Sequence, residues 1–382
     1  MTAEETPADL LIRLLEGKSA SRWPRIDGLD IARGLAFAGM VLVNYSIVMA
    51  GFGGGGPEWV GAMRDACTGR AAALFVLLAG CGMSLMLSRA DARGGKAATA
   101  RARSTYLRRS IALLVMGYAF CVIWSADILH YYAFYLVLGA LLSVLASRWL
   151  GAIALLCVVG FVVIYLWWIP YFTGWNIRTL EHHDFWTWLG QLRNLFYNGW
   201  HPLLPWFAFF LVGMIIGRWP LQRFVFSPLL LLVGAALAVG ARFGADALTD
   251  ALADSDLPRY QTEKWLGLFG KECIPPGPFY VLEATGTALA VIGMSLFIAR
   301  LPRWLWLPIA RTGRMALTLY VAHVVIGLEL WEQLGGDTDR ADMPEVFRWW
   351  LFSVIASLVF ATAWLQFRRR GPLEGLQRWI CG

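Results

Sequence analysis

Apolar segments long enough to cross a membrane recur along the whole 382-residue chain. A helix needs roughly 20 mostly apolar residues to span a bilayer. Only 15% of the residues are charged, whereas soluble domains carry about 25%. The segments that approach this length and composition are 31–50, 71–88, 110–124, 131–147, 150–169, 203–217, 228–244, 279–299, 315–334 and 346–367. The sequence therefore predicts an all-α polytopic membrane protein with about ten transmembrane helices, because lipid offers the backbone no hydrogen-bond partner.

Basic residues concentrate in alternate connections between these segments. They are Arg89, Arg93, Lys96, Arg101, Arg103, Arg108 and Arg109, then Arg218 and Arg223, then Arg300, Arg303, Arg311 and Arg314, then Arg368, Arg369, Arg370 and Arg378. The connection 245–278 is acidic instead. This positive-inside pattern predicts that both chain ends are cytosolic. The net charge of +7 then reflects topology, and nucleic-acid binding is not expected.

The same pattern divides the chain into three parts. Residues 1–30 are a cytosolic N-terminal tail, 31–367 form the membrane domain, and 368–382 are a basic cytosolic C-terminal tail. The protein is therefore expected in the plasma or inner membrane as a multi-pass protein.

The six cysteines show no metal-ligand spacing, so no metal is expected. Cys67 and Cys273 both fall outside the cytosol, and whether they pair is open.

The first apolar segment carries polar residues that lipid should exclude. Arg33 and Asn44 are eleven residues apart, so on a helix they point within about 20° of each other and are separated by roughly 16 Å. Asn44 can bond a neighbouring helix, or it can serve a site. Asp30, three residues before Arg33, can hold the guanidinium in place, which favours a functional role for Arg33 over simple contact with the membrane surface.

Asp127 and His130 lie at the start of the fourth apolar segment, on the extracytoplasmic side. A carboxylate three residues before a histidine can accept from one imidazole nitrogen and set the tautomer of the other. That arrangement suits a general base. Asp127 can equally cap the helix that follows, and interface histidines without a catalytic role are common.

Other ionisable residues lie at membrane depth or at its outer edge. His323 sits near the middle of the ninth segment, and His201 precedes the sixth. Glu283 lies about one turn into the eighth segment and needs a partner, for which Arg70 is a candidate. Each histidine can also be a neutral residue bonded to another helix. Glu283 and His323 can alternatively form the proton relay of a transporter.

Several motifs resemble one family of membrane enzymes. "RIDGLDIARGLAFAGMVLVN" (25–44), "GRAAALFVLLAGCGMSLML" (69–87), "DILHYYAFYLVLG" (127–139), "GRMALTLYVAH" (313–323) and "RRRGPLEGLQRW" (368–379) are similar to the heparan-α-glucosaminide N-acetyltransferase-like acyltransferases, in particular their bacterial, mostly uncharacterised branch. A second family, the O-acyltransferases of surface sugars, shares the opening Asp-x-x-Arg helix but places a histidine eleven residues after the arginine. Asn44 occupies that position here, which favours the first family.

The resemblance implies transfer of an acetyl or other short acyl group from cytosolic acyl-CoA to an amine or hydroxyl of an extracytoplasmic sugar or small molecule. The animal enzyme of the family is associated with a histidine in the loop after its first span, and residues 51–70 contain none. We therefore predict His130 as the base, Asp127 as its orienting carboxylate and Asn44 as an oxyanion donor. Predicted contacts to CoA are Asp30, Arg33, Arg108 and Arg109, and predicted acceptor contacts are Arg70, His201, Glu283 and His323.

Two other hypotheses stay open. The chain can be a proton-coupled transporter or lipid-handling protein without acyl transfer, although Gly and Pro interruptions of its apolar segments concentrate at their ends, whereas transporters usually show broken helices near the midplane. It can also be a family-like scaffold that has lost activity, since the loop histidine is missing. Expected partners are acyl-CoA, the acceptor and membrane lipids, and a homodimer is an open alternative.

Overall fold

The computed structural model describes residues 25–51, 55–176, 179, 181–337 and 340–381. These residues are mainly helical, with one short antiparallel ribbon in which Trp175 pairs with His182. The predicted all-α class is thereby confirmed. Residues 1–24 of the predicted N-terminal tail lie outside the described residues.

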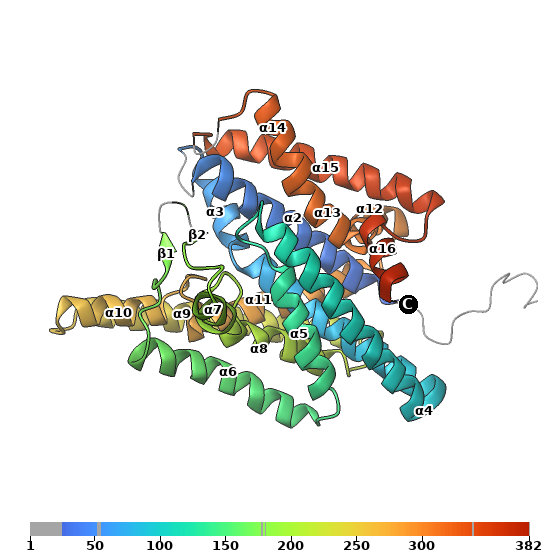
Figure 1. Ribbon diagram of the computed structural model, residues 1–382, viewed down its shortest axis with the longest axis horizontal. Coiled ribbons are helices and arrows are strands. Elements are labelled where there is room, and N and C mark those ends of the chain that lie inside the picture. The colour runs from blue at the N-terminus through green and yellow to red at the C-terminus, as the bar shows by residue number, and fades with distance from the viewer. Residues whose placement is uncertain (1–24, 52–54, 177–178, 180, 338–339, 382) are drawn as a thin grey trace, which may run out of the picture.

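The helices follow one another with short connections and pack into one bundle (Figure 1). They are α2 (Asp27–Ala50), α3 (Glu58–Cys67), α4 (Arg70–Cys121), α5 (Leu129–Leu142), α6 (Ser147–Trp167), α7 (Trp188–Arg193), α8 (Leu203–Ile216), α9 (Phe226–Ala253), α10 (Arg259–Phe269), α11 (Pro278–Ile298), α12 (Arg303–Arg314), α13 (Ala316–Ala322), α14 (Glu329–Gln333), α15 (Met343–Phe367) and α16 (Pro372–Cys381). The ribbon is β1 (Trp175–Asn176) and β2 (Glu181–His182), and two segments are π-helical, η1 (Asn194–Asn198) and η2 (His323–Leu328).

Six helical segments of the described chain are long and apolar enough to cross a membrane, and up to eight if each bent pair is one span. The bent pairs are α7 to η1 with α8, and α12 with α13 to α14, which bend by 50° and 71°. The predicted multi-pass character is confirmed by these helices. The predicted count of about ten is not reached by this criterion.

The helix α4 contains a sharp break at two glycines. A straight helix of its 52 residues would be about 78 Å long, far more than a bilayer core of about 30 Å. Gly94 and Gly95 have non-helical backbone angles, and Gly95 takes a φ of 58°, which only glycine adopts readily. The two limbs of α4 therefore lie side by side and meet at the tip labelled α4 in Figure 1.

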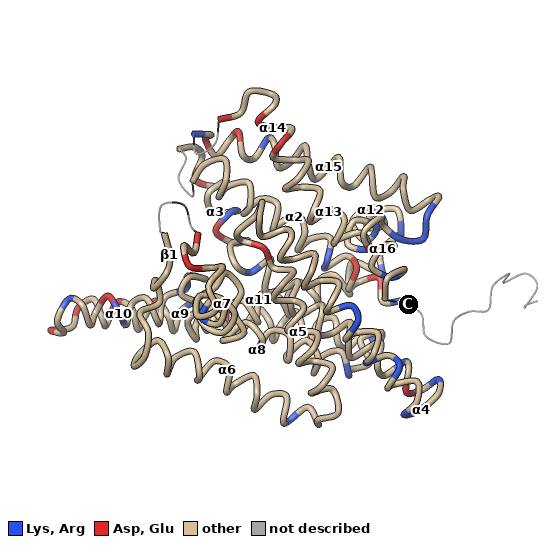
Figure 2. The backbone as a smooth tube through the Cα atoms, in the orientation of Figure 1, with Lys and Arg blue, Asp and Glu red and all other residues tan. Residues whose placement is uncertain are grey.

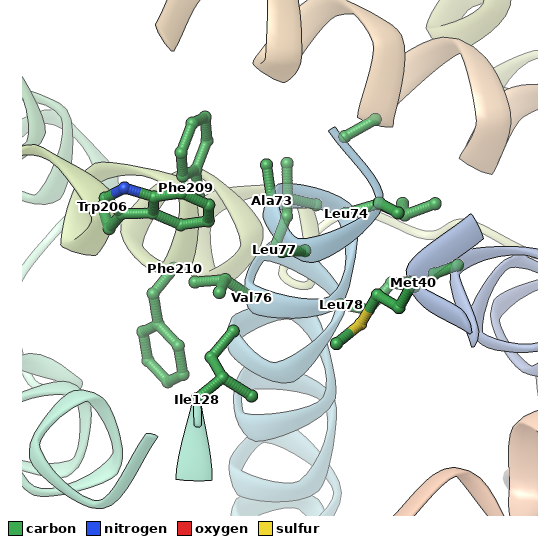
Figure 3. Close-up of a cluster of buried hydrophobic side chains, with 14 of the residues drawn as sticks. Met40, Ala73, Leu74, Val76, Leu77, Leu78, Ile128, Trp206, Phe209 and Phe210 are labelled. Carbon is green, nitrogen blue, oxygen red and sulfur yellow. The ribbon is translucent and has the colours of Figure 1, made fainter. Parts of the chain in front are cut away.

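The core of the bundle lies where α4 meets α2 and α8. Figure 3 shows its apolar side chains, with Met40 from α2, Leu77 from α4 and Phe210 from α8 among them. A Cβ on Gly80 would lie 2.0 Å from the Phe210 carbonyl oxygen, and one on Gly213 would lie 1.9 Å from that of Leu77. Glycines on both helices thus allow close backbone contact, as is common where helices pack inside a membrane.

The outer helices leave most of their apolar surface uncovered. Only 6% of the most apolar stretch of α15 is buried within the protein, and 22% of that of α6 and of α9. Phe352, Ile355 and Val359 of α15 are all more than half exposed. Exposed apolar faces of this extent are expected to contact lipid.

Candidate active site

Asn44 and His323 form a direct contact between the first helix and the broken helix near the C-terminus. Asn44 Nδ2 donates to His323 Nε2 at 2.9 Å, although the two residues are 279 positions apart. His323 is buried, at 5% exposure, and begins the π-helical segment η2. A π-helical turn departs from regular helix geometry and often occurs at functional sites. Asn44 was predicted as a site residue, but the identity of its partner was not.

Asp127 and His130 make the hydrogen bond that their spacing suggests. Asp127 Oδ2 accepts from His130 Nδ1 at 3.0 Å and also from the His130 backbone N–H at 3.1 Å. The carboxylate therefore orients the imidazole and caps the start of α5 at once. Both residues are buried, and a Cβ on Gly117 would lie 2.3 Å from the His130 backbone nitrogen. That glycine lets the second limb of α4 approach α5 at this point.

Tyr320 on α13 connects this pair to the rest of the site. Its hydroxyl donates to Asp127 Oδ1 at 3.4 Å and accepts from the Ile128 backbone N–H at the same distance. Its ring lies 5.4 Å from that of His323. No role was predicted for Tyr320 from the sequence, and the local signal that pointed to it is its position one turn before His323.

Three cavities adjoin one another along the bundle. The basic cavity, of about 770 Å³, lies between α2, both limbs of α4, α5 and α16. The middle cavity, of about 220 Å³, shares Arg33, Ala79, Leu113, Tyr132 and Gln377 with it. The aromatic cavity, of about 340 Å³, shares Met40 and Tyr320 with the middle one, and Asn44 lines it. The described residues that line these three cavities do not include His130 or His323.

Six arginines line the basic cavity, and they are Arg25, Arg33, Arg89, Arg93, Arg109 and Arg378. Asp30 lies among them and accepts from Arg33 at 2.6 Å and from Arg25. Arg33 and Asp30 thus pair as their spacing suggests. Arg109 lines this cavity as well, whereas Arg108 is exposed and is not among its lining residues. A cavity lined by several guanidinium groups is suited to a ligand that carries several phosphates.

The aromatic cavity has buried hydrogen-bond donors without partners. Trp200 and Trp206 line it at 9% and 1% exposure, and no described residue accepts from either indole N–H. His201, a predicted site residue, lines the same wall, and its Nδ1 likewise has no partner among the described residues. Buried donors of this kind are costly unless a ligand or water accepts from them. The cavity is therefore suited to a ligand that carries oxygen or nitrogen acceptors.

The ribbon after α6 supports this aromatic wall. The Trp175 ring lies 5.3 Å from that of Trp200 and 4.4 Å from that of His182. His182 Nε2 is 3.1 Å from the Asn198 carbonyl oxygen. Burial lowers the pKa of His182 to about 4, so its imidazole stays neutral at pH 7 and can donate to that carbonyl.

Cysteines lie at two places around the site. Cys67 and Cys273 both line the aromatic cavity and are free thiols. Cys121 Sγ lies 3.4 Å from His130 Nδ1, and the ligand atoms of Cys121, Asp127 and His130 fall within 4.8 Å of one another. A metal ion can use such a spacing. The Asp127 carboxylate and the His130 imidazole already satisfy each other by hydrogen bonding.

Arg70 and Glu283 pair across the bundle, behind the aromatic cavity rather than in its wall. Arg70 Nη2 donates to Glu283 Oε2 at 2.8 Å, and Glu283 is buried at 5% exposure. The more exposed Arg242 is 3.7 Å from the other carboxylate oxygen. Arg70 therefore supplies the counter-charge for the Glu283 carboxylate, which would otherwise be buried without a partner. Both residues were predicted to bind substrate, and their contacts give them a structural role as well.

Removing the arginine of this pair should lower stability. We expect Arg70→Met to reduce the free energy of unfolding by about 3 kcal/mol, because Glu283 is left largely unpaired. The double variant Arg70→Met/Glu283→Gln should recover most of that loss. Thermal unfolding of the purified protein in detergent measures both, and equal losses in the single and double variants would contradict the interpretation.

Helices that can cross a membrane, arranged around adjoining cavities, define a multi-pass membrane protein with an internal site. Residues 25–242 match the family model described as heparan-alpha-glucosaminide N-acetyltransferase, catalytic. Because this match covers more than half of the 382 residues, the chain belongs to that family, and membership implies acetyltransferase activity. Residues 278–381 match a second model, described as a protein of unknown function (DUF418). No curated protein matches the chain significantly.

The contact between Asn44 and His323 joins these two matched segments. Asn44 lies within 25–242 and His323 within 278–381. Tyr320 and Gln377, which line the cavities, also come from the second segment. The resemblance proposed from the sequence motifs is confirmed at the level of the family.

Proposed function

We propose that this protein transfers an acetyl or other short acyl group from acyl-CoA, bound from the cytosolic side, to an amine or hydroxyl of an extracytoplasmic acceptor. The observation that carries the proposal is the row of three adjoining cavities, which begins among six arginines and ends at indole donors that have no acceptor among the described residues. Met40 and Tyr320 stand where the middle and aromatic cavities adjoin. The thioester carbonyl would react there.

The proposed topology has about ten spans and two cytosolic ends, in a plasma or inner membrane. The break at Gly94–Gly95 supports a count of two spans for the limbs of α4, and the apolar helix α5 adds a further short span. Figure 2 shows that Lys and Arg gather near the α4 tip, α12 and α16. These elements would then face the cytosol, in keeping with the positive-inside rule. Arg89 and Arg93 of α4 and Arg378 of α16, which line the basic cavity, belong to these elements.

Acyl-CoA would place its phosphates among the arginines of the basic cavity. Arg33 lines both the basic and the middle cavity, so it would contact the donor where its pantetheine arm leaves the nucleotide. The middle cavity is mostly apolar, with Phe75, Leu113 and Leu129 in its wall. Such a channel suits a thin, flexible arm and excludes bulk water from the thioester.

The acceptor would bind in the aromatic cavity and attack the thioester carbonyl directly. Asn44 has a second amide N–H beyond the one it donates to His323, and this N–H would stabilise the oxyanion that forms. The acceptor proton would pass to the Tyr320 hydroxyl as that hydroxyl gives its own proton to Asp127, which His130 supports. When the tetrahedral intermediate collapses, the carbon–sulfur bond breaks and the proton held by Asp127 would return through the Tyr320 hydroxyl to the departing sulfur, so that CoA leaves as the thiol.

Binding of the donor alone tests this proposal. We expect acetyl-CoA to bind the purified protein, and Arg33→Gln or Arg93→Gln to weaken that binding about tenfold each, because each removes a charge-assisted contact to phosphate. Titration calorimetry measures the dissociation constants. Arg340→Gln is the matched control, since Arg340 pairs with Asp337 on an exposed connection away from the cavity.

The result also separates the classes of function. A transporter of unrelated cargo has no reason to retain CoA, so a wild-type protein that does not bind acetyl-CoA would contradict the proposed acyl transfer. Binding that the Arg33 and Arg93 variants leave unchanged would remove the basic cavity from the donor site.

A further inference from the structure

The C-terminal helix α16 has its apolar face on the outside. Pro372, Leu376, Trp379 and Ile380 are spaced so that they lie on one side of the helix. Leu376, Trp379 and Ile380 are 45%, 82% and 56% exposed. The opposite side holds Glu374 and Gln377, which contact the protein. A helix on the surface of a water-soluble protein shows the reverse arrangement, so this apolar face needs a cover.

The inward face of α16 is firmly attached to the broken helix. Glu374 Oε1 accepts from the backbone N–H groups of Leu317 at 2.8 Å and Thr318 at 3.1 Å. Glu374 Oε2 accepts from the Thr318 hydroxyl at 2.6 Å. These contacts bind a carboxylate to the N-terminus of α13, where helix donors are free and the dipole favours negative charge.

Chain connectivity places α16 at a membrane surface. The spanning helix α15 ends at Phe367, and α16 begins five residues later. Arg368, Arg369 and Arg370 lie between them and are all exposed, and Arg378 of α16 is exposed as well. Figure 2 shows this basic stretch at the end of α15, next to α16. An exposed apolar stripe beside clustered arginines is complementary to an anionic bilayer surface.

We propose that α16 docks on the cytosolic membrane surface, with Leu376, Trp379 and Ile380 inserted at the level of the headgroups and the neighbouring arginines bound to anionic lipids. Gln377 and Arg378 of the same helix line the basic cavity. Docking therefore holds one wall of that cavity in place. The consequence for donor affinity rests on the proposed function, whereas the docking itself does not.

The test uses the full-length protein in nanodiscs of phosphatidylcholine, with or without phosphatidylglycerol. Hydrogen exchange of residues 372–381, followed by mass spectrometry, reports docking directly. We expect exchange to be about tenfold slower with the anionic lipid, because insertion suppresses local opening of the helix. Trp379→Glu/Ile380→Glu should abolish that difference. Trp188→Glu, at a comparably exposed tryptophan of α7, is the matched control and should leave the difference unchanged.

Acetyl-CoA affinity is measured in the same nanodiscs. We expect tighter binding with the anionic lipid for the wild type and no lipid effect for the Trp379/Ile380 variant. Equal exchange in the two lipids would overturn docking on an anionic surface. Slower exchange with unchanged donor affinity would overturn the link to the cavity. Slower exchange with no acetyl-CoA binding in either lipid would support docking and count against the proposed function.

Discussion

Asn44→Ala should lower the turnover of acetyl transfer by about 10²–10³-fold while acetyl-CoA still binds. Asn44 lines the aromatic cavity, which adjoins the middle cavity. Its Nδ2 donates one of its two hydrogens to His323 Nε2, and the two nitrogens are 2.9 Å apart. The other would meet the oxyanion, which exists only in the transition state. Loss of that hydrogen bond should therefore reduce kcat and kcat/KM together.

Substitutions at His323 test how the amide is held. His323→Ala should resemble Asn44→Ala, because the amide loses its orientation, whereas His323→Gln keeps an acceptor and should retain part of the activity. Ser46→Ala is the matched control, since Ser46 is buried on the same helix and its hydroxyl donates to the Leu42 carbonyl. Steady-state kinetics with labelled acetyl-CoA measures all four variants. Equal activity of Asn44→Ala and Ser46→Ala would exclude Asn44 from the mechanism.

The second large effect is expected at the proton path. His130→Ala and Tyr320→Phe should each reduce turnover by about 10²–10⁴-fold, the usual contribution of a positioned base. Tyr320→Phe removes a single oxygen atom, which is the atom that connects Asp127 to the cavities. Because the two groups act in one path, the double variant should be little worse than either single variant.

Controls separate chemistry from folding here. Tyr165→Phe removes a hydroxyl that donates to the Lys264 carbonyl and does not line the three cavities, so its turnover should match the wild type. Donor affinity should persist in all variants. Transfer should also survive a chelator, because no step needs a metal. Full activity in His130→Ala with lost activity in Tyr320→Phe would show that Asp127 accepts the proton without support from His130.

Local parts of this site could be predicted from spacing along the chain. The pairs Asp30–Arg33 and Asp127–His130 lie three residues apart, where helix geometry brings side chains together. The partner of Glu283 could be proposed because a buried carboxylate requires one. The family likewise followed from short motifs, the first of which contains Arg33 and Asn44.

Contacts between distant helices could not be predicted in this way. The bond from Asn44 to His323 depends on how α2 packs against a helix that bends and then becomes π-helical, and neither feature has a clear sequence signal. The same holds for Tyr320. The sequence predicted where His130 lies along the chain, but not that its ring is separated from the cavities. Tyr118 and Phe185 pack on that ring. Its link to the cavities therefore passes through Tyr320.

The division of the site between two matched segments restricts how the gene can be rearranged. A polypeptide that stopped near residue 242 would keep most of the arginines of the basic cavity and the Asp127–His130 pair. It would lack His323, which accepts from Asn44, as well as Tyr320 and the helix α16. A gene fission at this boundary would preserve function only if both products were made together and reassembled in the same bilayer.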